Sequence, residues 1–252
     1  MNVLTIASIN INGLYARTHV SMLHDYIRRH DLDIVMLQEV TDPTILQVMG
    51  YATYLNIGAE MRGTAILAKQ ELSLTEVTLL PSGRAIAATH SGIRLINVYA
   101  PAGTARRAER EQFFNSELAT LLYDATPLTL IGGDFNCVLQ QADTTGPFTT
   151  SRALSEIVRG LALMDAWNQS PQQPTFTHFS PTGATRIDRF YLTRDLLGRK
   201  TGIEVLPAPF TDHEAVALRL SVTNERTRWR RSRWKMGPHM VADPAMKGKL
   251  GA

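Results

Sequence analysis

The stretch "LTLIGGDFNC", residues 128–137, runs from an apolar strand through two glycines to Asp134 and Asn136. A carboxylate that is buried without a partner costs several kcal/mol, so a core strand needs compensation where it ends in one. The two glycines leave room for another backbone or a ligand to come close. The stretch therefore predicts a buried strand that presents polar groups to a site, and such a site needs partners from other strands.

Polar residues stand at or near the ends of other predicted strands in the same way. They are Asn10, Glu39, Tyr99, Asp188, Asp212 and His213. Taken singly, each has an ordinary explanation as a turn former, a solvated strand edge, a half-buried core aromatic or part of a surface ion pair. Together they can form one site at the strand ends, where a metal ion and a histidine offset the free-energy cost of burying carboxylates.

The hydrophobic pattern predicts many short strands and few helices. Helices are expected at residues 17–30, 106–123 and 151–160, and Ser151 is expected to cap the last of them. Strands are expected at residues 3–10, 34–37, 51–57, 63–69, 72–80, 84–90, 93–101, 127–136, 175–179, 186–192, 202–206 and 214–222. This order predicts an α/β fold built as a four-layer sandwich, in which two packed, mainly antiparallel sheets are flanked by helices.

The composition is that of a globular protein, with 44% hydrophobic and 19% charged residues in a chain of 252. No apolar run approaches the roughly 18 residues of a membrane span, and the first residues lack the basic flank of a signal peptide. Cys137 is the single cysteine, which excludes an internal disulfide and a cysteine-based zinc site and suits a reducing compartment.

Charge is distributed unevenly along the chain. Residues 226–252 contain eight basic side chains and one acidic one, whereas residues 1–225 carry a small excess of acidic ones. We expect a catalytic domain over residues 1–222, followed at 223–252 by a basic tail that contains Arg and Trp. Such a tail could bind nucleic acid through charge and stacking, or it could serve as a linker to a neighbouring domain.

A set of carboxylates and amides with one histidine suits metal-assisted hydrolysis of a phosphodiester. Carboxylate and amide oxygens favour a hard cation such as Mg²⁺, with Mn²⁺ as the alternative, over zinc. The ion would polarise a phosphoryl oxygen or ease departure of the leaving group. A further carboxylate would orient or deprotonate the attacking water, and a histidine held by an aspartate could donate to the phosphoryl oxygen.

Six short motifs occur in the order and spacing of a known superfamily. They are "SININGL" at 8–14, "LQEV" at 37–40, "NVYAP" at 97–101, "GGDFN" at 132–136, "RIDRF" at 186–190 and "TDH" at 211–213. In this order they resemble the endonuclease/exonuclease/phosphatase superfamily, which includes exonuclease III, the apurinic endonucleases and DNase I. The resemblance covers about residues 1–222 and implies a DNase I-like fold.

The resemblance also implies a metal-binding group and a catalytic group. The metal-binding group consists of Glu39, Asn10 and Asp212. The catalytic group consists of Asp134, His213, Asp188, Asn136 and Tyr99. In the superfamily the first aspartate orients or activates water, the asparagine steadies the phosphate, the tyrosine contacts it, and the histidine pairs with the second aspartate.

Departures from the repair-type apurinic endonucleases narrow the choice within the superfamily. Those enzymes usually carry an asparagine at the position of Ala102, an aspartate at that of Asn12 and an aromatic residue at that of Thr185. The motifs "NVYAPAG" and "IGGDFNCVL" are most similar to the endonuclease domain of non-LTR (LINE-type) retrotransposons, and the basic "RSRWKM" resembles the stretch that follows this domain in their polyproteins.

This closer resemblance implies that a monomeric, membrane-free domain nicks one strand of duplex chromosomal DNA in the nucleus. The nick would leave a 3′-hydroxyl that primes reverse transcription by a downstream reverse transcriptase domain of the same polyprotein. Candidates for contacts with DNA phosphates are Arg62, Arg106, Arg107 and Arg110, although a solvated helix face explains the last three equally well. Candidates for reading the target, on a predicted hairpin at 176–186, are His178, Thr182 and Arg186.

Three other functions remain open on the sequence. The chain could be an apurinic/apyrimidinic repair endonuclease, or a phosphodiesterase of the same superfamily that acts on lipids or small molecules. It could also be a catalytically silent DNA-binding module. The retention of Glu39, Asp134, Asp188 and His213 together argues against a silent copy.

Overall fold

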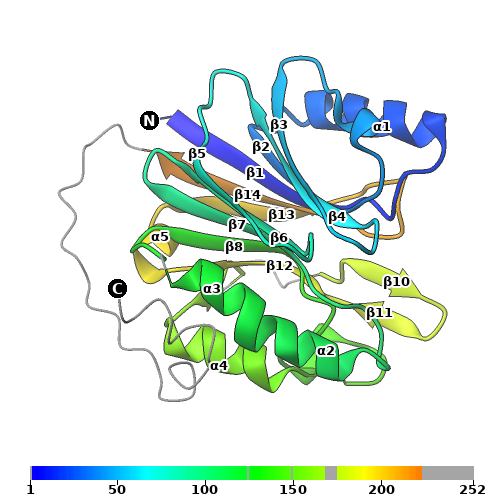
Figure 1. Ribbon diagram of the computed structural model, residues 1–252, viewed down its shortest axis with the longest axis vertical. Coiled ribbons are helices and arrows are strands. Elements are labelled where there is room, and N and C mark those ends of the chain that lie inside the picture. Colours follow the sequence, from blue (N-terminus) through cyan, green and yellow to red (C-terminus); the bar gives the residue numbers. More distant parts are fainter. Residues whose placement is uncertain (1, 124, 149, 168–174, 223–252) are drawn as a thin grey trace.

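The computed structural model describes residues 2–123, 125–148, 150–167 and 175–222. Figure 1 shows two sheets stacked on one another, with α1 beside one of them and α2, α3 and α4 beside the other. The predicted four-layer α/β sandwich is therefore confirmed. The predicted basic tail at 223–252 lies outside the described residues. Within the part of the chain that is described, no helix has the length and apolar character needed to cross a membrane.

The first sheet pairs the first strand of the described residues with the last one. Its strands lie in the order β13 (Lys200–Leu206), β14 (Ala215–Val222), β1 (Asn2–Asn10), β2 (Ile34–Val40), β4 (Gly63–Lys69) and β3 (Tyr51–Ile57). β1 and β2 run parallel, and the other neighbours run antiparallel. Because β1 and β2 are parallel, with Asn10 opposite Gln38, the polar ends of both strands meet at one edge of the sheet.

The second sheet brings the other strand ends together. Its strands lie in the order β5 (Thr75–Leu79), β6 (Ala85–His90), β7 (Ile93–Tyr99), β8 (Thr129–Asp134), β12 (Asp188–Leu192) and β9 (Met164–Asp165). β7 and β8 are parallel, and the other pairs are antiparallel. In this register Asp134 lies opposite Tyr99 on one side and opposite Asp188 on the other.

Alternation along the strands assigns successive side chains to different layers. Ile6 of β1 points between the sheets, where it belongs to the same buried cluster as Phe190 of β12. Its neighbour Ala7 points outward and packs with Leu23 of helix α1 (Arg17–Arg29). A large apolar side chain that is fully buried stabilises the fold by about 1.5–3 kcal/mol, so this alternation fixes which face of each strand is inside.

The remaining helices and helical turns of the described residues lie in different layers: those at 107–122 and 152–160 cover the outer face of the second sheet, the turn at 43–46 packs beside the first sheet, and the helix at 194–197 packs into the cluster between the sheets. They are α2 (Arg107–Gln112), a π-helical turn (Phe113–Leu118), α3 (Ala119–Leu122), α4 (Arg152–Gly160), α5 (Arg194–Leu197) and short 3₁₀ turns at Pro43–Leu46 and Gln141–Asp143. The continuous helix predicted at 106–123 is thus interrupted by the π-helical turn. The predicted cap of α4 is confirmed, since the Ser151 hydroxyl accepts a hydrogen bond from the backbone N–H of Leu154 at 3.1 Å.

A small hairpin stands apart from both sheets, beside the polar strand ends. It consists of β10 (His178–Ser180) and β11 (Gly183–Thr185). An isolated bridge pairs His178 with His213, so the hairpin is attached to the loop that carries the "TDH" motif. The predicted strand at 175–179 is therefore shorter and shifted, and the hairpin predicted at 176–186 is present.

Candidate active site

Asp134 lies at the centre of a buried hydrogen-bond network that joins the two sheets. Its Oδ1 accepts from the backbone N–H of Asn136 at 2.8 Å. Its Oδ2 accepts from the side-chain amides of Asn10, at 2.9 Å, and Asn136, at 3.0 Å. The Asn136 amide also donates to the carbonyl oxygen of Ala100 at 2.9 Å, so both of its amide hydrogens are used within the protein. Asn136 therefore positions Asp134 here and does not reach outward toward a phosphate.

Gly132 and Gly133 make room for protein atoms on both sides of this strand. A Cβ at Gly132 would lie 2.3 Å from the ring of Phe190. A Cβ at Gly133 would lie 1.9 Å from the carbonyl oxygen of Val98 on β7, and φ is +139° at this position. The close backbone approach predicted from the sequence is thus that of β7, which sets Asp134 beside Tyr99.

His213 and Asp188 form a second buried unit next to Asp134. The Nδ1 atom of His213 lies 2.9 Å from Asp188 Oδ2, which also accepts from the Thr177 hydroxyl at 2.6 Å. The backbone N–H of Asp188 donates to the same hydroxyl at 3.1 Å. One carboxylate oxygen thus orients the imidazole, and Nε2 of His213 is left for another partner. The Oδ1 atom of Asp188 is buried and accepts no hydrogen bond from the residues that the structure describes.

The charges of these groups shift one another's pKa values. Burial, and then the negative charge of Asp188, raises the pKa of Asp134 to about 7. Burial alone would lower the pKa of His213, but the carboxylates of Asp188, Asp134 and Asp212 outweigh it and raise that pKa to about 9. At neutral pH, Asp134 can therefore take up a proton while His213 is charged and can donate one, which is the pairing that base and acid roles require.

Glu39 is placed by an irregularity in β2. The register with β4 shifts between Gln38 and Val40, and Glu39 has a φ of +57°. A bulge of this kind re-aims a side chain, and such backbone conformations are concentrated at functional sites. Glu39 is 8% exposed; its Oε1 accepts from the Asn10 amide at 3.1 Å, and its Oε2 is in an ion pair with Arg62.

Asn12 links Asp212 to this network. Its backbone N–H donates to Asn10 Oδ1 at 3.0 Å, and its side-chain amide donates to Asp212 Oδ1 at 3.2 Å. The Thr211 hydroxyl donates to the backbone carbonyl of Asn10 at 2.9 Å. The loop after β1 and the loop before β14 are therefore tied together on the side where the strand ends meet.

Tyr99 lies beside Asp134 at the end of β7. It is 4% exposed, and the Arg84 guanidinium lies 5.3 Å from the centre of its ring. Burial raises the pKa of the Tyr99 phenol, and the charge of Asp134 acts in the same direction. The phenol therefore stays protonated at neutral pH and can serve as a hydrogen-bond donor.

The residues around Glu39 suit a hard divalent cation. Glu39 is bonded to the Asn10 amide and Asp212 to the Asn12 amide, and their carboxylate oxygens are the ligands that Mg²⁺ and Mn²⁺ prefer. Oε2 of Glu39 is buried and forms an ion pair with the guanidinium of Arg62, so a positive charge is already present where an ion would bind. The amide of Asn10 turns its nitrogen toward Glu39 and its oxygen toward Asn12, so it would ligate through oxygen only after turning.

The structure corrects two predicted DNA contacts. Arg110 is 1% exposed and donates to the backbone carbonyls of Pro101 and Gly103. Arg186 is 2% exposed and forms ion pairs with Asp143 at 2.7 Å and Asp165 at 2.8 Å. The prediction that these arginines contact DNA is wrong, because both guanidiniums are buried and hold neighbouring segments in place.

The other predicted DNA contacts lie at or near the surface. Arg62 and Arg107 are exposed, whereas Arg106 is ion-paired with Glu60 and Glu109. Thr182 is exposed at the tip of the β10–β11 hairpin. His178, whose side chain is 25% exposed, stands at the base of the hairpin with its ring 4.7 Å from that of His213. Burial lowers the pKa of His178, and the charge of His213 lowers it further.

Three residues of the site were not identified from the sequence. Thr177 binds Asp188, Asn12 joins Asn10 to Asp212, and Asp143 pairs with both Arg186 and Arg189. Thr177 stands next to His178 in "TFTHF", but nothing local in the sequence marks its bond to Asp188. Asp143 carried no signal, because its partners lie more than forty residues further along the chain.

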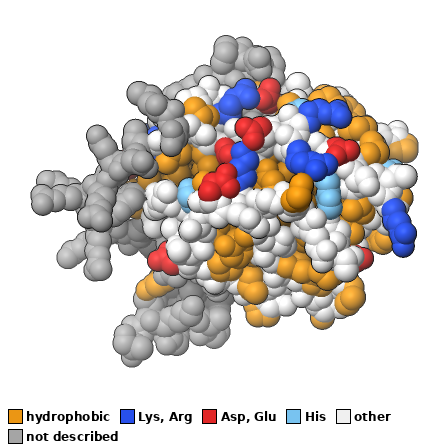
Figure 2. Space-filling view, turned by 90° about the horizontal axis from the view of Figure 1, so that it is seen from above, with side chains coloured by type: hydrophobic (Ala, Val, Ile, Leu, Met, Phe, Trp, Pro, Cys, Tyr) orange, Lys and Arg blue, Asp and Glu red, His pale blue; other side chains and the backbone are white. Residues whose placement is uncertain are grey.

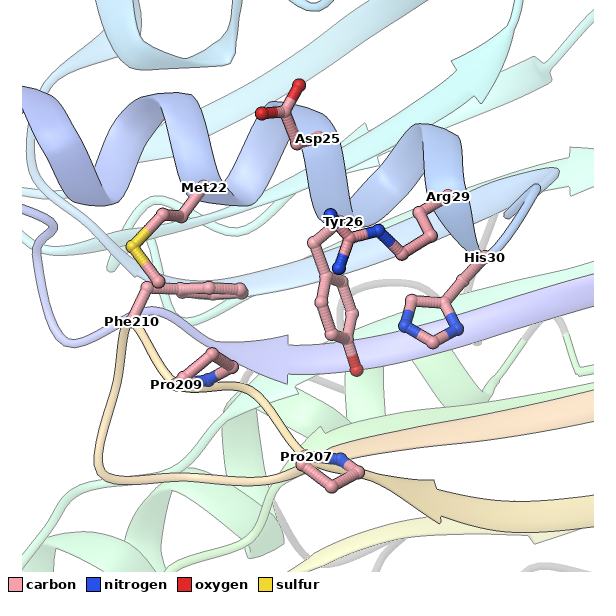
Figure 3. A pocket seen from close by; sticks show the side chains of 8 residues that line it. All are labelled: Met22, Asp25, Tyr26, Arg29, His30, Pro207, Pro209 and Phe210. Atoms are coloured by element: carbon pink, nitrogen blue, oxygen red, sulfur yellow. The ribbon is translucent and has the colours of Figure 1, made fainter.

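A cavity of about 300 Å³ lies away from these residues, between α1 and the segment 207–210 (Figure 3). Met22, Tyr26 and Phe210 give it an apolar wall, and Asp25, Arg29 and His30 line its rim. None of the predicted catalytic residues contributes to it. Seen from above, the described residues carry basic and acidic side chains intermingled on that face (Figure 2).

A buried carboxylate, Asp134, lies across the strand pair from an Asp–His pair, so a base and an acid stand next to each other at the strand ends. Residues 7–213 match the Endonuclease/Exonuclease/phosphatase family, and the chain belongs to that family. The resemblance to this superfamily inferred from the six motifs is thereby confirmed.

Proteins similar to this chain include a transposon protein and several solved structures. The "Transposon TX1 uncharacterized 149 kDa protein" of Xenopus laevis is 28% identical over 244 residues, which cover 87% of this chain. The chain spans only 18% of the length of that relative.

Solved structures share the fold at lower identity. An AP endonuclease from Archaeoglobus fulgidus has a TM-score of 0.75 at 20% identity, covering 87% of this chain and 100% of that one. An AP endonuclease from Leishmania major has a TM-score of 0.74 at 17% identity, covering 88% of both chains. A 3′-5′ exonuclease from Neisseria meningitidis has a TM-score of 0.74 at 23% identity, covering 87% of this chain and 100% of that one. These likenesses confirm the DNase I-like fold.

Proposed function

We propose that this protein is a Mg²⁺-dependent endonuclease that nicks one strand of duplex DNA. The proposal rests on two neighbouring hydrogen-bonded pairs of side chains, Asp188–His213 and Asn10–Asp134. They occur in a chain of the Endonuclease/Exonuclease/phosphatase family. The two units place a basic carboxylate and a charged imidazole side by side. Hydrolysis of a phosphodiester needs both, one for the water and one for the phosphoryl oxygen.

In this proposal the roles follow from the hydrogen bonds. Asp134, held by Asn10 and Asn136, orients the attacking water and accepts its proton. His213, held through Nδ1 by Asp188, donates from Nε2 to the phosphoryl oxygen as its negative charge grows. Tyr99 donates its hydroxyl to the phosphate, and Asn136 acts as a positioning residue for Asp134.

Glu39 and Asp212, with Asn10 as the third predicted ligand, would hold the metal. A bound Mg²⁺, or Mn²⁺ in its place, supplies Lewis-acid polarisation of the phosphoryl group and charge for the departing oxygen. Arg62, which faces Glu39, would then be released to contact a DNA phosphate together with Arg107. The exposed tip of the hairpin around Thr182 is proposed to contact the groove and to influence the choice of target, with His178 at its base.

We further propose that the domain comes from a non-LTR retrotransposon and acts on chromosomal DNA in the nucleus. The similarity to a transposon protein of Xenopus laevis, of which this chain spans 18%, supports this origin. The nick would leave a 3′-hydroxyl, and a reverse transcriptase domain of the same polyprotein would extend it. Duplex DNA and that downstream domain are the proposed partners, and the isolated domain is proposed to be a monomer.

The experiment is a nicking assay on supercoiled plasmid with Mg²⁺, run beside a duplex that carries one abasic site. Asp134→Asn, which removes a charge and little volume, is the matched inactive control. Mg²⁺-dependent nicking of undamaged plasmid, with 3′-hydroxyl ends that a polymerase can extend, is the expected result. Cutting confined to the abasic duplex would indicate a repair endonuclease, and cutting of neither substrate, with hydrolysis of a small phosphodiester, would indicate a phosphodiesterase.

A further inference from the structure

Two histidines and an aspartate meet at the base of the β10–β11 hairpin, next to the Asp188–His213 pair. His178, Asp212 and His213 each offer a ligating atom, and these atoms all lie within 4.8 Å of one another. His178 Nε2 is 3.9 Å from Asp212 Oδ2. A tetrahedral ion with bonds of about 2.0–2.1 Å needs ligands roughly 3.3 Å apart, so these side chains must move together by about 1 Å to bind one. Asp212, with a half-exposed side chain, can close the remaining gap.

The other nitrogen of each imidazole already has a partner, as in protein metal sites. His213 Nδ1 is bound to Asp188, and His178 Nδ1 lies 3.5 Å from the Thr185 hydroxyl. A histidine that ligates a metal usually binds a carboxylate or another polar group through its second nitrogen, which fixes the ring. The Nε2 atoms of both rings, and Oδ2 of Asp212, are the donors that remain.

Backbone pairing holds the two histidines in this arrangement. His178 and His213 form an isolated antiparallel bridge, and the backbone N–H of Glu214 donates to the Thr177 carbonyl at 2.7 Å. The two rings lie with centroids 4.7 Å apart and planes inclined by 45°, so they are neighbours without being stacked flat. A pair of imidazoles fixed in this way loses little side-chain freedom when an ion binds.

We propose that His178, Asp212 and His213 form a binding site for a borderline transition-metal ion, with Zn²⁺ as the strongest candidate, and that the bound ion inhibits hydrolysis. Imidazole nitrogen suits Zn²⁺, Co²⁺ and Ni²⁺, whereas the carboxylates around Glu39 suit Mg²⁺. The site differs from the proposed Mg²⁺ site by its two histidines and shares Asp212 with it. Three protein ligands leave a fourth position for water or a phosphate oxygen.

Inhibition is expected because Nε2 of His213 would be both a metal ligand and the proposed proton donor. When Nε2 of His213 coordinates an ion, its proton is released to solvent and the atom can no longer donate to a phosphoryl oxygen. Asp212 is withdrawn from the Mg²⁺ site at the same time. Excess Mg²⁺ competes only for the carboxylate and does not bind imidazole well, so it would relieve the inhibition weakly.

The test measures binding directly on the whole chain and then measures inhibition. Zn²⁺ affinity is determined by competition with a chromophoric chelator, and Co²⁺ is added separately to look for the visible absorption of a four-coordinate site. The variant is His178→Phe, which keeps a ring of similar size without a ligand atom. His90→Phe, which changes a histidine on another strand, is the matched control.

We expect His178→Phe to weaken Zn²⁺ binding at least about ten-fold and to remove the Co²⁺ absorption, while His90→Phe changes neither. For each variant that nicks plasmid, the Zn²⁺ concentration that halves its own Mg²⁺-supported rate should rise by a similar factor in His178→Phe alone. Equal Zn²⁺ affinity in the parent and His178→Phe would overturn the site. Loss of binding without a change in Zn²⁺ inhibition would overturn its inhibitory role.

The binding measurement contains no substrate, so it is independent of the proposed nuclease function. If the chain binds Zn²⁺ through His178 but nicks no DNA, the metal site stands and the nuclease proposal fails. If it nicks DNA and His178→Phe binds Zn²⁺ as well as the parent does, the nuclease proposal stands and the site fails. Circular dichroism of His178→Phe confirms that the variant is folded in each case.

Discussion

His213 lies with its Nδ1 atom 2.9 Å from Oδ2 of Asp188, and the same oxygen accepts from the Thr177 hydroxyl at 2.6 Å. This carboxylate both fixes the ring and, with Asp134 and Asp212, raises the pKa of His213 to about 9 against the opposing effect of burial. The imidazolium is therefore charged across the neutral range. The pair predicts how activity depends on pH.

Asp188→Asn should move the alkaline limit of activity to lower pH. In the proposed mechanism the His213 imidazolium is the proton donor, so the rate of the parent should fall as pH rises through about 9. Without the charge of Asp188 the pKa of His213 returns toward its ordinary 6.5, and the fall should begin correspondingly earlier. A pH profile of the single-turnover nicking rate measures this, and an unchanged alkaline limit would show that His213 is not the titrating donor.

The same shift should appear in stability. Because the folded pKa of His213 is raised above its unfolded value, the contribution is complete below about pH 6.5 and is lost as pH rises through about 9. Urea unfolding at pH 6.5 and pH 9.5 should show a smaller fall in stability for His213→Gln than for the parent. An equal fall in both proteins would assign the pH dependence to other groups.

Asp134→Asn and His213→Ala should each lower the nicking rate at least about 100-fold while leaving DNA binding largely intact. Each removes a group that is proposed to act on the reacting atoms, and neither side chain is exposed enough to supply much affinity. The rate at saturating DNA and the dissociation constant from a filter or anisotropy assay separate the two effects. Activity within a factor of a few of the parent would reject the assigned roles.

Glu39→Gln and Arg62→Ala should change the Mg²⁺ requirement in opposite directions. Loss of a charged ligand should raise the half-saturating Mg²⁺ concentration about ten-fold or more. Loss of Arg62, which is ion-paired with Glu39 and whose side chain is 43% exposed, removes a competing cation. Its effect should be a decrease of up to about five-fold, since partly exposed pairs contribute about 1 kcal/mol or less. Mg²⁺ titrations at saturating DNA test both, and a rise in Arg62→Ala would contradict the competition.

Arg186→Ala should destabilise the fold by about 3–5 kcal/mol, because it breaks a buried ion-pair network and leaves Asp143 and Asp165 short of a partner. Arg152→Ala is the matched control. Arg152 pairs with Glu156 one helical turn away, with its side chain 89% exposed, and its loss should cost at most about 0.5 kcal/mol. Urea unfolding gives both values, and similar effects in the two variants would contradict the importance assigned to burial.

Gly133→Ala should destabilise the protein by about 1–3 kcal/mol and lower activity, because the added methyl group would meet the Val98 carbonyl and displace Asp134. Gly160→Ala, at the end of α4, has no atom within 4 Å of the added methyl and should be neutral or slightly stabilising. Thermal unfolding and nicking of the two variants provide the comparison. Full activity in Gly133→Ala would mean that β7 and β8 can separate without moving the carboxylate.

The sequence predicts the layers of this fold well because each layer is encoded locally. Alternation places Ile6 between the sheets and Ala7 against α1, and a single strand is enough to show that pattern. The interruption of the helix at Phe113–Leu118 was not predicted, since α-helical and π-helical turns carry the same kind of apolar residues.

The candidate site was predicted as a set of residues and not as a set of contacts. Asp134 and Asp188 were found from strand ends and motif order, but their direct cross-strand pairing depends on a register that no local pattern contains. Arg186 and Arg110 were misassigned for a related reason. An arginine next to a motif has the same appearance in sequence whether it faces solvent or a distant aspartate such as Asp143.

Asn10 belongs to one sheet and Asp134 to the other, and a single hydrogen bond of 2.9 Å joins them. The candidate active site therefore lies between the two sheets, and neither sheet contains all of its residues. Sliding of one sheet past the other would lengthen this bond and turn the carboxylate away from the position proposed for the attacking water. The catalytic rate therefore depends on the relative position of the two sheets. Mild denaturants or pressure that loosen the packing between them should abolish nicking activity before secondary structure is lost.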